Sequence, residues 1–186
     1  MKSLLVTAAV ALLALPATGK AQQPAQPQMP QAAGPFAAAM LQVWNRAARN
    51  MPAAGDDMPA EKYSFKPTDG QMSFGHVLAH ETMSNETLCR AIAGTGGTPT
   101  EAAPDSTAPK DQILARLRKS FDTCRDVVSQ LKESSLGDSV PFFGGRKATK
   151  ATAAVYLVTD WADHYAQAAA YLRAAGILPP SARRRM

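Results

Sequence analysis

The chain contains three histidines, and their spacing is the first indication of chemistry. His76 and His80 are four residues apart, so on a helix both side chains point to the same side. His164 follows Asp160 at the same spacing. Two such polar strips, facing each other across a pair of helices, form the kind of groove in which helical bundles hold divalent metal ions. A histidine at the flank of a helix is more often structural, however, and this spacing alone is a weak metal signature.

The donor atoms of such a groove restrict the ions that it would bind. Neutral imidazole and carboxylate groups suit Zn²⁺, Ni²⁺, Fe²⁺ or Mn²⁺. An ion with an open coordination position lowers the pKa of a bound water, which is a route to hydrolysis. The sequence contains no recognisable Ser/His/Asp arrangement for nucleophilic catalysis. The Gly-Gly-Arg-Lys segment at 144–147 lacks the spacing of a phosphate-binding loop. The sequence therefore assigns no catalytic residue.

Four segments with apolar residues at helical spacing would have to position these groups. Aromatic residues make up only 6% of the 186 residues, which argues against an all-β fold. Helix-ending signals follow the first segment at Met51-Pro52 and the last at Gly176, and Ser73 is placed as the N-cap of the second. We predict an all-α four-helix bundle with helices over residues 36–50, 74–93, 109–131 and 149–175.

Two polar residues interrupt the apolar stripe of the second predicted helix. Glu81 and Asn85 fall in line with Val77, Leu78 and Leu88 at 100° per residue. Polar groups in such a stripe need partners. They are either satisfied core residues or part of a site, and the residue pattern favours neither.

The ends of the chain differ in composition from this helical region. Residues 1–21 combine an early lysine, an apolar run over 4–15 and small residues near 21, which is typical of a secretory signal; the alternative is an uncleaved membrane anchor. We therefore expect export to the periplasm or the medium. The Pro/Gln-rich residues 22–35 predict a flexible tether, residues 36–182 the folded domain, and residues 183–186 a basic tail.

The charge and hydropathy of the chain exclude two classes of partner. The formal charge of +5 falls to +3 without Lys2 and Lys20, too little to indicate a nucleic-acid-binding protein. No segment after residue 21 is apolar for long enough to cross a bilayer. The expected partner is a small molecule of unknown identity, and the oligomeric state stays open, with a homodimer among the alternatives.

Several segments resemble the DinB-like family. They are residues 73–80 (SFGHVLAH) with Asn85 and Cys89 following, residues 163–167 (DHYAQ), and residues 171–180 (YLRAAGILPP). The resemblance covers about residues 36–182. It implies an up-down-down-up bundle, in which the connection over residues 94–109 crosses from one end to the other. Sixteen extended residues reach about 50 Å, enough to span a helix about 30 Å long.

The resemblance also implies a metal site. Carried over by position, the ligands are His80, Asp160 and His164, with Asp160 at a position where the family has histidine; His76 or Glu81 would complete the set. Similar proteins include metal-dependent hydrolases, so we expect an exported metal-dependent hydrolase of unknown substrate. The alternative is a non-enzymatic ligand-binding or envelope stress protein whose metal site is degenerate.

The positions of the two cysteines distinguish a parallel from an antiparallel arrangement of the second and third predicted helices. Cys89 and Cys124 lie at similar distances from the starts of the second and third predicted helices. Parallel helices would place them at the same height, where a disulfide is allowed, whereas antiparallel helices joined by a tight turn would separate them by about 15 Å. The alternative to the disulfide is two buried thiols.

Overall fold

The computed structural model describes residues 31–96, 102 and 105–183. The predicted signal segment, residues 1–21, and most of the predicted tether lie outside the described residues. Four helices make up most of the structure: α1 (Pro35–Asp57), α2 (Phe74–Ala93), α3 (Lys110–Ser129) and α4 (Lys150–Ala174). Two short strands, β1 (Ser139–Pro141) and β2 (Lys147–Thr149), form a hairpin before α4. The described residues therefore confirm the predicted all-α four-helix bundle.

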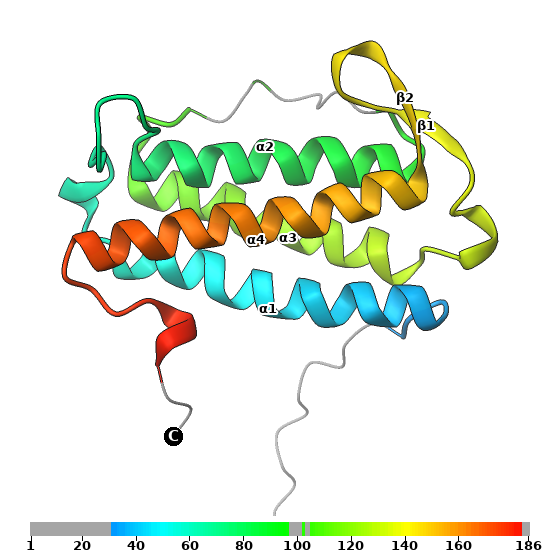
Figure 1. Cartoon of the computed structure of the whole chain (residues 1–186), viewed down its shortest axis with the longest axis horizontal. Coiled ribbons are helices and arrows are strands. Elements are labelled where there is room, and N and C mark those ends of the chain that lie inside the picture. The colour runs from blue at the N-terminus through cyan, green and yellow to red at the C-terminus, as the bar shows by residue number, and fades with distance from the viewer. Residues whose placement is uncertain (1–30, 97–101, 103–104, 184–186) are drawn as a thin grey trace, which may run out of the picture.

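The helices are arranged up-down-down-up. In Figure 1, α2 and α3 run in the same direction, and α1 and α4 run in the opposite direction. Because α2 and α3 are parallel neighbours, the connection between them has to return to the end of the bundle where α2 begins. Ser106 confirms this return, since its carbonyl oxygen would lie 3.0 Å from a Cβ at Gly75, in the first turn of α2.

Local capping explains where the helices that carry the histidines begin and end. The Ser73 hydroxyl accepts a hydrogen bond from the His76 N–H at 3.2 Å and caps the start of α2, as predicted. Gly94, with φ 77°, ends α2 in the left-handed conformation that glycine adopts most easily. Thr149 caps α4 in the same way as Ser73 caps α2.

The first helix is longer than predicted. The sequence predicts its end at Asn50, before Pro52, but α1 continues through this proline to Asp57. A proline inside a helix costs roughly 3 kcal/mol. Burial of Met51, Ala54 and Met58 at the continued end outweighs that cost. Gly55 allows this end to pack closely, because a Cβ there would lie 2.4 Å from the Leu114 side chain.

The hairpin before α4 was not predicted, because residues 132–148 lie between two predicted helices and no strand was assigned to them. Its strands pair antiparallel, and the buried Val140 attaches it to the bundle. Gly144 and Gly145 have φ values of 66° and 72°, as the tightest hairpin turns require at two successive positions. A Gly-Gly pair between short β-prone segments is the signal that would have identified it.

The folded region begins a few residues before its predicted boundary at residue 36. The Ala33 N–H donates to the Ser129 carbonyl oxygen at 2.8 Å, and the Phe36 N–H donates to the Glu133 carboxylate at 2.8 Å. These contacts fix the start of α1 against the end of α3. Within residues 31–96, 102 and 105–183, no helix is long and apolar enough to span a bilayer.

A disulfide joins Cys89 of α2 to Cys124 of α3 across the parallel helix pair. Their Cα atoms are 5.4 Å apart, and both residues are fully buried. Because the bridge spans 35 positions and the long connection between the two helices, it restricts the unfolded chain substantially.

We expect this disulfide to contribute about 3–4 kcal/mol to the free energy of unfolding, the value that the chain-entropy model gives for such a loop. Denaturant titration of the oxidised protein and of the Cys89→Ala/Cys124→Ala double variant measures the difference. Thiol titration of denatured, unreduced protein is expected to find no free thiol. Two free thiols per chain would contradict the bridge.

Candidate metal centre

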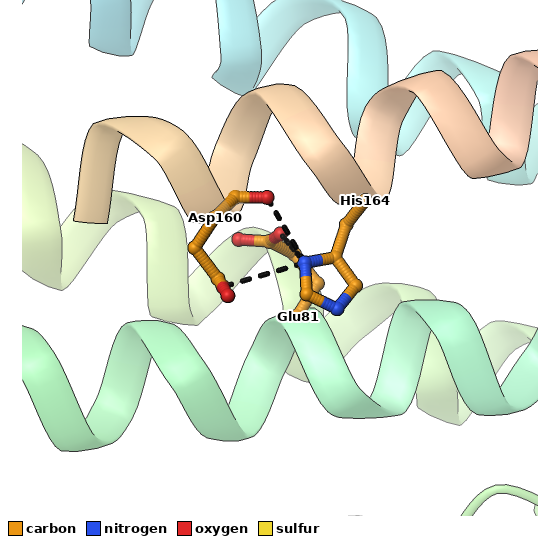
Figure 2. A group of neighbouring side chains, drawn as sticks. All are labelled: Glu81, Asp160 and His164. Atoms are coloured by element: carbon orange, nitrogen blue, oxygen red, sulfur yellow. Dashed lines mark hydrogen bonds and ion pairs between the residues drawn. The ribbon is translucent and has the colours of Figure 1, made fainter. Parts of the chain in front are cut away.

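Three side chains from two helices converge inside the bundle. Glu81 of α2 faces Asp160 and His164 of α4, and each of the three offers one ligand atom within 4.8 Å of the others (Figure 2). Asp160 and His164 are one helical turn apart, so α4 presents both to the same side. Two of the three predicted ligands are therefore brought together, and Glu81, predicted as an additional ligand, joins them.

The His164 ring is oriented by its own helix. Its Nδ1 lies 2.9 Å from the backbone carbonyl oxygen of Asp160, which only accepts hydrogen bonds, so the tautomer with its proton on Nδ1 donates a hydrogen bond there. The same Nδ1 lies 3.4 Å from the Asp160 carboxylate and 3.5 Å from the Glu81 carboxylate. One imidazole nitrogen thus lies among three oxygens, and two of these belong to acidic side chains.

The carboxylates of this cluster lack hydrogen bonds. Both Glu81 oxygens and Oδ2 of Asp160 are buried without a hydrogen-bond partner among the described residues, although the His164 ring is near enough to attract them electrostatically. Burial raises the pKa of Glu81 well above 4.5, and the Asp160 carboxylate raises it further. Unsatisfied buried carboxylate oxygens are costly, and a divalent cation would satisfy all three at once. The donor set therefore fits a metal ion.

The other two histidines lie beside the cluster. The His80 ring packs against the His164 ring, with centroids 4.9 Å apart, but His80 contributes no atom to the group of ligands within 4.8 Å. Burial lowers the pKa of His80, and the nearby His164 lowers it further. His76 is exposed at the start of α2. The structure thus brings Glu81 into the group with Asp160 and His164, and His80 lies beside this group.

The apolar stripe of α2 already pointed to Glu81, but could not separate its role from that of Asn85. Asn85 is a satisfied core residue, because its amide accepts from Trp161 Nε1 at 2.6 Å and donates to Ser120 at 3.0 Å. Glu81, one turn earlier, has no such partners. Whether each side chain has hydrogen-bond partners depends on the residues that face it. Those residues follow from the packing of α2 against α3 and α4, and the sequence pattern of α2 does not give them.

Replacing Glu81 by glutamine is expected to stabilise the metal-free protein by about 1–3 kcal/mol at neutral pH, because an unsatisfied buried acid becomes a neutral amide. A raised pKa means that the folded state binds more protons than the unfolded state above pH 4.5. The stability of the wild type should therefore fall as pH rises from 4.5, and that of Glu81→Gln should fall less.

Thermal or denaturant unfolding in chelator across this pH range measures the effect. Glu61→Gln, the same change at an exposed position, should leave stability within about 0.5 kcal/mol of the wild type. Equal pH dependence in Glu81→Gln and wild type would contradict the assignment of a strained buried carboxyl group.

Comparisons with known proteins agree with this architecture. The chain is similar to a DinB-like protein from Bacillus cereus ATCC 10987, with 19% identity and a TM-score of 0.62 over 76% of this chain and 93% of that one. It is also similar to a DinB-like protein (YjoA) from Bacillus subtilis, with 18% identity and a TM-score of 0.62 over 80% and 99% of the two chains. At these identities the likeness concerns the fold alone. No curated protein matches the chain.

The family match is independent of these two structures. The sequence model of the DinB superfamily matches residues 44–168, a range that includes the three converging residues and both cysteines. Because this match covers more than half of the sequence, the chain belongs to the DinB superfamily.

Proposed function

We propose that this protein binds a divalent metal ion through Glu81, Asp160 and His164 and hydrolyses a small-molecule substrate. The observation that carries the proposal is the set of three buried carboxylate oxygens without hydrogen bonds beside an imidazole. When bound, such an ion polarises a substrate oxygen and lowers the pKa of a coordinated water. His80 stays a candidate for a further ligand, because its ring packs on that of His164.

The residues of the chain determine how such an ion would be held. Two carboxylates balance the charge of a divalent cation, which compensates their burial in the bundle. Burial raises the pKa of Glu81, so a cation bound at this carboxyl group competes with its proton. Metal binding should therefore weaken as pH falls. A ligand set with more oxygen than nitrogen suits Mn²⁺ and Fe²⁺ better than a set of three imidazoles does.

We also propose that the protein is exported. The support is the composition of residues 1–21, with one early lysine and an apolar run followed by small residues. A disulfide between Cys89 and Cys124 is consistent with an oxidising compartment.

Metal binding is expected at about one ion per chain, with at least a tenfold loss of affinity in Glu81→Gln, Asp160→Asn and His164→Ala. A tenfold loss corresponds to about 1.4 kcal/mol, less than a single charged ligand usually contributes. Calorimetric titration of untagged protein with Mn²⁺, Zn²⁺ and Ni²⁺, together with elemental analysis, measures stoichiometry and affinity. His80→Ala should lose less than the three other variants.

Two further variants separate binding from folding. Asp163→Asn removes an exposed carboxylate on the same helix and should keep wild-type affinity. Asp160→His should increase affinity for Zn²⁺ and Ni²⁺, a gain that misfolding would not produce. Negligible metal in wild type and in all variants would contradict the proposed site. If metal binds but no panel of esters, amides and phosphoesters is hydrolysed, the hydrolase assignment is wrong and the binding assignment stands.

The exported protein is expected to begin at or near Gln22. Intact-mass measurement of protein from the periplasm or the medium tests this directly. A chain that retains Met1 in the membrane fraction would show an uncleaved anchor instead.

A further inference from the structure

Apolar side chains are exposed where the hairpin meets the start of α4. Phe143 at the hairpin turn is 41% exposed, and Val155 and Tyr156 on α4 are 58% and 50% exposed. The Phe142 ring lies between two of them, with its centroid 4.9 Å from that of Phe143 and 5.0 Å from that of Tyr156. We call these four residues the hairpin patch. It is separate from the candidate metal centre.

The hairpin patch is carried by a projecting turn. A Cβ added to Gly144 or Gly145 would meet no atom within 4 Å, so open space surrounds the turn. Figure 1 shows the hairpin standing clear of the helices at one end of the bundle. A projecting tip of this kind is shaped to contact a flat surface.

The charged residues within the hairpin are basic, and one acidic residue, Asp138, precedes it. Residues 139–150 include Arg146, Lys147 and Lys150 and no acidic residue. Arg146 and Lys147 are exposed, and Arg146 Nε donates to the Phe143 carbonyl oxygen at 3.3 Å, which keeps this cation beside the exposed ring. Lys150 is paired with Asp138 at 3.4 Å, so the two cations of the hairpin itself define the charge of the tip.

We propose that the hairpin patch binds the surface of an anionic lipid membrane. Aromatic rings favour the interface between headgroups and acyl chains, and lysine and arginine are attracted to anionic headgroups. The patch combines both features on a projecting turn, and its positive charge is complementary to a negative surface. This assignment depends on the hairpin alone and on neither the metal site nor export.

Vesicle sedimentation tests the proposal with purified protein whose N-terminus has been established by mass spectrometry. The wild type should sediment with vesicles of equal parts phosphatidylcholine and phosphatidylglycerol. It should sediment much less with phosphatidylcholine alone, and added salt should weaken binding. Lys147→Glu should weaken binding at least fivefold, the change expected for one cation near such a surface. Phe143→Ser should weaken binding to a similar extent.

Matched controls lie away from the patch. Lys62→Glu makes the same charge change at an exposed position near the start of α2, at the other end of the bundle. Leu178→Ser removes an apolar side chain that is 58% exposed after the end of α4. Both controls should keep wild-type binding.

Three results would overturn the proposal. The first is equal sedimentation with neutral and anionic vesicles, and the second is an equal loss in Lys62→Glu and Lys147→Glu. The third is light scattering that shows a dimer, lost in Phe143→Ser, without vesicle binding; a second copy of the chain would then be the occupant of the patch.

Discussion

The buried face of α2 has to pack its apolar side chains tightly and also provide partners for its polar side chains. This helix packs against both α3 and α4, and its core face carries Glu81 and Asn85 among Phe74, Leu78 and Leu88. Asn85 meets the constraint by bonding to both neighbouring helices. Its bond to Trp161 holds α2 against α4 beside Asp160, the residue that precedes this tryptophan in the chain. The position of the candidate metal centre depends on this contact.

Glu81 meets the same constraint differently. No group in the described part of the chain donates a hydrogen bond to its carboxylate, and the Asp160 carboxylate repels it. A bundle selected for stability alone would place leucine or glutamine there. Two acids beside an imidazole, without hydrogen bonds from the described residues, reduce the stability of the fold when no cation is bound.

Sequence patterns predicted the elements of the fold better than the details of the site. The 3.6-residue periodicity identified the four helices, since that signal depends only on which residues are apolar. The end of the first helix was predicted wrongly because the tendency of proline to end a helix is a local property. The burial of Met51 and Met58, which offsets that tendency, depends on tertiary packing. The hairpin was missed because its strands are only three residues long, too short for an alternating pattern to be readable.

The predicted metal ligands show a different limit of prediction from the sequence. Successive residues of a helix differ by 100° in direction, so the choice between His80 and Glu81 depends on how far α2 is rotated toward α4. The apolar stripe placed Glu81 inward and His80 at the flank, and the structure agrees with that pattern. The resemblance to the family gave His80 as a ligand, and the structure places the His80 ring against that of His164.

The disulfide between Cys89 and Cys124 also reduces how much the link between α2 and α3 depends on the connection between these helices. In a bundle without such a bridge, the connection is the covalent link between two consecutive parallel helices. Here the two helices are joined covalently at a second point, so a cut within residues 94–109 would leave a single molecule until its disulfide is reduced. Doubling the length of this connection would cost only about 0.6 kcal/mol in closure entropy. An insertion between Gly94 and Ser106 would therefore leave the covalent link between α2 and α3 in place.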